Sequence, residues 1–207
     1  MGARVGIVDS GGPAAQMAGA RSFTRLPVAP DHLGHGSAVA GVIARAAPDA
    51  RLIHAQVFAD RPVTNADAVA QAVDWLAPQC DIVVLSLGLA ADRAALCDAV
   101  AAAQTRAVLV ASSPARGRIC WPAAYPGVVA ATGDARCGWD ELSSLPGGII
   151  GAWCGSPEQG GSAMGGASLA AARVVGHLAD AGPAAWVAPL DWLHTRAAHH
   201  GAERRTG

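Results

Sequence analysis

Residues 4–11, RVGIVDSG, are an apolar run that ends in a carboxylate and a glycine turn. A short run of this kind suits a strand that is buried on both faces of a parallel sheet. Four further runs of the same character follow at residues 51–57, 81–87, 106–110 and 128–131. Alanine-rich helical patterns fill the intervals at residues 36–46, 66–76, 92–103 and 167–179, and Asn65 stands as an N-cap before the second. The alternation predicts an α/β fold, a three-layer sandwich with a mainly parallel central sheet.

The pattern favours a single domain over residues 1–194, because no linker or internal repeat interrupts it. Residues 112–126 and 134–166 are rich in Gly, Pro and Ser, so we expect two long loops there. Long loops in a compact domain are usually functional. The polar residues 195–207 are expected to form a solvated, mobile tail.

The composition of the chain excludes several classes of protein. With 52% hydrophobic and 15% charged residues, the chain can bury a core and is not expected to be disordered. A net charge of -1 gives no basic surface for nucleic acid, and no apolar run is long enough for a membrane span. The five dispersed Cys residues favour free thiols in a reducing compartment, so we expect a cytoplasmic protein.

Three reactive side chains stand beside glycine at the ends of predicted elements. Asp9 ends the first strand, His35 lies between two glycines before a helix, and Ser168 follows a glycine-rich loop at a helix start. Each alone has an ordinary explanation. Asp9 suits a turn, His35 with His32 has weak metal-ligand spacing, and residues 160–166 could cradle a phosphate, although the chain has no Lys. Together they supply a hydroxyl nucleophile, a base and an acid that orients the base.

The sequence around these residues resembles the subtilisin-like serine proteases. Residues 7–11, IVDSG, are similar to the family's Asp motif, and residues 35–41, HGSAVAG, to its His motif. Residues 166–176, GASLAAARVVG, are similar to its Ser motif GTSMASPHVAG, in a register that selects Ser168 rather than Ser162. Residues 85–88, LSLG, resemble its substrate-binding strand.

The resemblance implies a subtilisin-like fold with Ser168 as nucleophile, His35 as general base and acid, and Asp9 as the group that orients His35. It also implies that Ser86, Leu87 and Gly88 hold a peptide or protein substrate as an added strand. Neither a cofactor nor a metal ion is expected, calcium included, because the Asp residues are scattered and Asn is scarce.

One departure concerns the oxyanion hole, where the family usually places an Asn. The corresponding loop, residues 111–117, reads ASSPARG, and the only Asn of the chain is Asn65, in another predicted element. Ser112, Ser113 or a water could replace the amide, or Arg116 or Arg118 could reach the oxyanion. The third alternative is a degenerate fold that binds peptides without cleaving them.

The small size is similar to that of leader-cleaving subtilases encoded with peptide-modification systems. We therefore expect a dedicated processing protease that removes a leader from a modified peptide or small subunit, with a peptide-modifying enzyme as a further partner. A non-catalytic peptide escort is the alternative.

Overall fold

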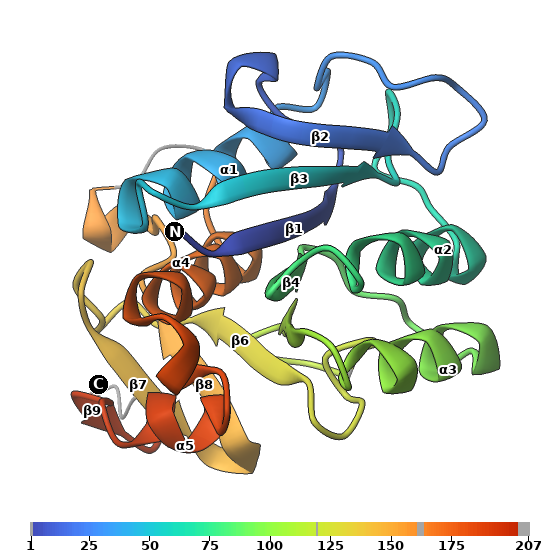
Figure 1. Cartoon of the computed structure of the whole chain (residues 1–207). Coiled ribbons are helices and arrows are strands. Elements are labelled where there is room, and N and C mark those ends of the chain that lie inside the picture. Colours follow the sequence, from blue (N-terminus) through green and yellow to red (C-terminus); the bar gives the residue numbers. More distant parts are fainter. Residues whose placement is uncertain (1, 119, 161–163, 203–207) are drawn as a thin grey trace.

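A computed structural model describes the chain except residues 1, 119, 161–163 and 203–207. A nine-stranded sheet forms the centre, in the order β2-β3-β1-β4-β5-β6-β8-β7-β9 (Figure 1). Neighbouring strands are parallel except β7 and β8, which form an antiparallel pair. The strands are β1 (Arg4–Asp9), β2 (Met17–Ser22), β3 (Arg51–Gln56), β4 (Ile82–Leu85), β5 (Val108–Ser112), β6 (Val129–Gly133), β7 (Leu142–Leu145), β8 (Ile149–Ala152) and β9 (His199–His200).

Helices cover both faces of the sheet, which confirms the predicted fold class. One face packs against α1 (His35–Ala46) and α4 (Ala167–Ala181), and the other against α2 (Ala66–Leu76) and α3 (Ala94–Ala103) (Figure 1). The short helix α5 (Pro189–His194) contacts β7. Among the described residues, no helix has the length and apolar character needed to cross a membrane.

The core follows from the strand pattern. Alternate residues of β1 point to opposite faces, so Ile7 enters the core beneath α1 and α4, whereas Val8 enters the core beneath α2 and α3. The helix α4 is buried along most of its length, as its apolar surface predicts. Asn65 caps α2 as expected, since its side-chain oxygen accepts a hydrogen bond of 2.9 Å from the Ala68 N–H.

The five strands and four helices expected from the sequence are confirmed, with boundaries within two residues. The expectation of a long loop over residues 134–166 is wrong, because β7 and β8 form a hairpin there. Within the expected tail, residues 199–200 are at least partly exposed and pair with β7 as β9. Residues 203–207 of that tail lie outside the described residues.

The parallel topology brings the candidate functional residues to one edge of the sheet. Asp9 is the last residue of β1, Ser86 follows β4, and Ser112 ends β5. The helices α1 and α4 begin at the same edge, so their first residues, including His35 and Ser168, lie close to these strand ends. In open α/β sheets, this carboxyl edge is where ligands bind.

Candidate active site

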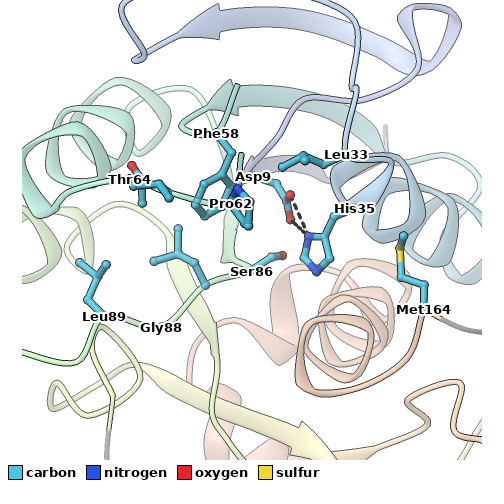
Figure 2. A pocket seen from close by; sticks show the side chains of 12 residues that line it. Asp9, Leu33, His35, Phe58, Pro62, Thr64, Ser86, Gly88, Leu89 and Met164 are labelled. Atoms are coloured by element: carbon cyan, nitrogen blue, oxygen red, sulfur yellow. Dashed lines mark hydrogen bonds and ion pairs between the residues drawn. The ribbon is translucent and has the colours of Figure 1, made fainter. Parts of the chain in front are cut away.

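Asp9 and His35 form a close pair at the carboxyl edge of the sheet. The Nδ1 atom of His35 lies 2.9 Å from Oδ1 and 2.8 Å from Oδ2 of Asp9 (Figure 2). The Asp9 side chain is fully buried, whereas 33% of the His35 side chain is exposed. A carboxylate accepts the proton on Nδ1, which leaves Nε2 as the acceptor in the neutral ring. Figure 2 shows Nε2 pointing away from Asp9.

This contact makes His35 a stronger base. The hydrogen bond with Asp9 raises the pKa of His35 above its ordinary value, burial opposes the increase, and the negative charges of Asp9 and Asp31 add to it. A histidine with a raised pKa accepts a proton more readily from a hydroxyl that attacks a carbonyl.

Asp31 is a site residue that sequence reasoning missed. Its carboxylate accepts hydrogen bonds from the N–H groups of Gly34 at 2.9 Å and Ser37 at 2.7 Å, and from the hydroxyls of Ser37 at 2.7 Å and Ser10 at 2.8 Å. Burial acts to raise the pKa of Asp31, but these hydrogen bonds outweigh it and hold the pKa below its ordinary value. Asp31 therefore fixes the first turn of α1, and an acid just before a helix start was the available signal.

The glycines beside His35 have distinct structural reasons. Gly34 has a φ of 71°, in the left-handed region that favours glycine. A Cβ at Gly36 would collide with the carbonyl oxygen of Gly11, in the turn that follows Asp9. The start of α1 thus packs directly on the turn after β1, and this close approach brings the imidazole to the carboxylate.

Ser168 lies at the start of α4, between the ends of β4 and β5. Its hydroxyl donates a hydrogen bond of 3.3 Å to the carbonyl oxygen of Ser86, and the hydroxyl oxygen of Ser112 lies 3.4 Å from its own. Among the described residues, no hydrogen bond joins His35 to Ser168. The N–H groups of the first helical turn have no partner within the helix, so α4 offers donors beside this hydroxyl. The alternative Ser162 lies outside the described residues.

The segment Ser86, Leu87 and Gly88 extends beyond β4 with little pairing. The N–H of Ser86 bonds to the carbonyl of Val8 at 3.3 Å. Within the described chain, Leu87 and Gly88 make no backbone hydrogen bond to another backbone group, and pairing resumes at Leu89. This segment therefore leaves donors and acceptors for an added strand.

A pocket of about 630 Å³ opens beside this segment and reaches Asp9 and His35 (Figure 2). Most of its wall is apolar, and it is supplied by Leu33, Phe58, Pro62, Val63, Leu87, Leu89 and Met164. An apolar cavity with a few polar groups at one end suits the side chains of a peptide whose backbone lies near His35.

The residues considered for the oxyanion hole separate in space. Ser112 is buried beside Ser168, with its hydroxyl 3.4 Å from the carbonyl oxygen of Leu85. Ser113 uses its backbone N–H on the carbonyl of Ala131 at 2.7 Å. Arg116 lines a different cavity, together with Thr132 and Cys154, rather than the pocket that holds His35. Of the serines, Ser112 is therefore the one that contacts Ser168.

Metal-ligand side chains do not gather around the pair. In the described part of the chain, no group of three or more His, Cys, Asp or Glu residues is arranged to hold a metal ion. The five Cys residues are free, and Cys80, Cys137 and Cys154 are buried.

No protein-family model matches the sequence, and no curated protein sequence matches it. Among solved structures, the chain is similar to a cold adapted subtilisin-like serine proteinase, with a TM-score of 0.66 and 21% identity over 84% of this chain and 72% of that one. It is also similar to a lanthipeptide protease, with a TM-score of 0.62 and 18% identity over 84% of this chain and 71% of that one. These likenesses show that the chain has a subtilisin-like fold.

Proposed function

We propose that this chain is a serine endopeptidase that hydrolyses a peptide bond through an acyl-enzyme, with Ser168, His35 and Asp9 as its triad. The observation that carries the proposal is the contact between His35 and a fully buried Asp9, beside a pocket that extends to Ser86. The Ser86 carbonyl in turn holds the hydroxyl of Ser168. A buried acid that orients a histidine, at the same sheet edge as a helix-start serine, is an arrangement that can activate a hydroxyl nucleophile.

The reaction requires one change at Ser168. Its proton, which is directed at the Ser86 carbonyl, turns to Nε2 of His35 as the hydroxyl oxygen attacks the substrate carbonyl carbon. Catalytic hydrogen bonds often form fully only when substrate is bound. His35 then gives the proton to the leaving amine. A water molecule, whose proton passes to His35, attacks the acyl-enzyme, and the new carboxylic acid leaves as Ser168 takes the proton back. Asp9 remains ionised and stabilises the imidazolium.

The oxyanion would be stabilised by the N–H of Ser168 and the hydroxyl of Ser112. The N–H lies in the first turn of α4, where the helix dipole favours negative charge. The Ser112 hydroxyl, 3.4 Å from that of Ser168, supplies the second donor. Loss of one such donor lowers turnover by roughly 100- to 1000-fold, so a hydroxyl in place of the usual amide suits a slow, dedicated enzyme.

The substrate would be a peptide or protein segment that pairs with Leu87 and Gly88 as an added strand. The apolar pocket favours apolar side chains elsewhere along the bound segment. We propose a cytoplasmic processing role, the removal of a leader from a modified peptide or small subunit, such as that of quinohemoprotein amine dehydrogenase. A peptide-modifying enzyme of the same pathway would be a partner. The likeness to a lanthipeptide protease is consistent with a peptide substrate.

A fluorophosphonate probe tests the proposal. Intact protein should be labelled covalently at Ser168, and both Ser168→Ala and His35→Ala should abolish labelling while the fold remains intact by circular dichroism. Mass spectrometry of the labelled peptide identifies the modified serine. Labelling at another residue would contradict the assignment.

The second candidate is a peptide escort without catalysis. It is favoured by the hydrogen bond that directs the Ser168 hydroxyl to Ser86 instead of His35. An escort would bind apolar peptides in the same pocket yet leave the probe unreacted, and its affinity would be unchanged in Ser168→Ala.

A further inference from the structure

Cys120 lies between the two segments that contact Ser168. The Sγ atom of Cys120 donates a weak hydrogen bond of 3.6 Å to the carbonyl oxygen of Ser112. Ser112 and Ser86 are the residues whose oxygens lie 3.4 Å and 3.3 Å from the Ser168 hydroxyl. The thiol therefore occupies the space between the end of β5 and the segment that follows β4.

Gly88 shows how closely the thiol fills this space. A Cβ at Gly88 would lie 2.9 Å from Sγ and 3.2 Å from Cβ of Cys120, so the thiol group occupies the side-chain volume that Gly88 leaves. Its position is fixed by its neighbour, because Trp121 and Leu89 exchange backbone hydrogen bonds of 2.7 and 3.0 Å. This bridge holds the backbone beside Cys120 close to the segment that contains Gly88.

In the proposed peptidase, a peptide that adds a strand to Leu87 and Gly88 and presents its carbonyl carbon to Ser168 would direct one side chain toward the space between Gly88 and Ser112, where Cys120 lies. That side chain belongs to the residue on the acyl side of the cleaved bond. We propose that the Cys120 thiol fills part of this space and limits that substrate residue to a small one, Gly, Ala or Ser. The proposal rests on the proposed peptidase function and adds its principal size filter.

The chemistry of the thiol agrees with a neutral wall. Burial raises the pKa of Cys120, so the group stays protonated at neutral pH and presents a compact, weakly polar surface. Arg116, which was considered above for the oxyanion, lines another cavity. Size, rather than charge, is therefore the property that the space beside Cys120 selects.

The test compares peptide p-nitroanilides that differ only in the residue before the cleaved bond, which is Ala, Leu or Phe. The wild type should cleave the Ala substrate with a kcat/KM at least tenfold above that for Phe. Cys120→Gly should raise the Phe-to-Ala ratio by roughly 10- to 200-fold, the range for a few atoms in an apolar pocket, and Cys120→Ala by less. Cys97→Ala, a partly buried thiol on α3, is the matched control and should keep the wild-type ratio.

Two further measurements separate this inference from the proposed function. Fluorophosphonate labelling of each variant reports the catalytic serine whatever the pocket size. Binding of the same peptides to Ser168→Ala and to Ser168→Ala/Cys120→Gly reports pocket size without hydrolysis. Labelling with an unchanged Phe-to-Ala ratio would overturn the role of Cys120, whereas absent labelling with a shifted binding ratio would overturn the peptidase and uphold the size filter.

Discussion

Each residue of the Asp9 and His35 pair depends on the other for its role. The carboxylate is fully buried and both of its oxygens lie within 2.9 Å of Nδ1 of His35. It also accepts a hydrogen bond of 2.6 Å from the Ser10 N–H, which holds it in place. The imidazole is therefore held in one orientation before any substrate arrives, which is the condition for general-base catalysis.

Replacement of Asp9 by Asn should lower the pKa of His35, because the raised value depends first on the hydrogen bond with Asp9. An NMR titration of the imidazole checks this, with a midpoint above 6.5 in the wild type and a lower one in Asp9→Asn. Turnover should fall by about ten-thousand-fold, because the amide favours the wrong tautomer. An unchanged midpoint would contradict the role of Asp9.

The same shift predicts a pH dependence of stability. A pKa that is higher in the folded protein than in the unfolded chain gives a stabilisation that is fully present below pH 6.5, the unfolded value. It is lost as the pH rises through the raised pKa of His35. Urea unfolding from pH 6 to 9 should show this decrease in the difference between the free energies of unfolding of the wild type and His35→Ala, because His54 and His177, whose pKa values burial lowers, act in the opposite direction in both proteins.

Ser112→Ala should lower the turnover number by up to roughly 100-fold while it leaves KM nearly unchanged, since the hydroxyl would act on the oxyanion rather than on the bound peptide. Steady-state kinetics on the Ala p-nitroanilide provide the measurement. Ser144→Ala, whose hydroxyl contacts His194 at 2.8 Å, is the matched control. A rise in KM alone would assign Ser112 to substrate binding.

At the scale of elements, caps and close approaches decide where helices start. Asp31 fixes the start of α1 and Asn65 that of α2, whereas α4 begins at Gly166 without a side-chain cap. An uncapped start leaves the first N–H groups of α4 available to a ligand, and Ser168 lies among them. The helix α3 also begins without a side-chain cap, so what sets α4 apart is the position of Ser168 beside Ser86 and Ser112.

Asn65→Ala should reduce the free energy of unfolding by about 1 kcal/mol, because the Ala68 N–H loses its partner. Thermal unfolding should show a Tm lower by roughly 2–4 °C for a chain of this size. Asn65→Asp keeps the acceptor and should retain the wild-type Tm. Equal losses in both variants would mean that the cap does not account for the effect.

The sequence predicted those elements whose own residues supply the driving force. The strands β1, β3, β4, β5 and β6 are apolar runs buried on both faces, so their pattern is visible without neighbours. By contrast, β2, with the sequence MAGARS, is half exposed at an edge, and β7 and β8 have four residues each. Such strands exist because a neighbour supplies hydrogen bonds, which a local pattern does not record.

The residues of the candidate site also fall into those that the sequence predicted and those that it did not. Asp9, His35 and Ser168 were predicted from motifs that each combine a reactive residue with glycine. Asp31 carried a local signal, an acid just before a helix start, whereas Cys120 was missed because only the folded chain brings it close to Gly88. The motifs therefore indicate which residues are reactive, whereas the contacts that position those residues and limit the space beside them depend on tertiary packing.

For the whole molecule, β9 sets how much of the C-terminal segment the fold needs. Ala198 and Gly201 donate backbone hydrogen bonds to β7 at 2.8 and 2.9 Å, and Arg136 donates one of 2.8 Å to the carbonyl of Gly201. A chain that ends after Ala202 should therefore keep the wild-type Tm. For a chain that ends after His194, the free energy of unfolding should be lower by about 2 kcal/mol and the Tm lower by roughly 4–8 °C. Equal Tm values for the two truncations would show that β9 adds nothing to stability.

The order of the elements along the chain also determines when each one emerges from the ribosome. Asp9 and His35 emerge early, but α4, which carries Ser168 and packs against β4, β5 and β6, emerges only after all three of those strands. Translation adds about 5–20 residues per second, so Ser168, the proposed nucleophile, emerges several seconds after Asp9 and His35. A growing chain thus has no assembled triad, and the proposed hydrolytic activity begins only when α4 has docked on the sheet.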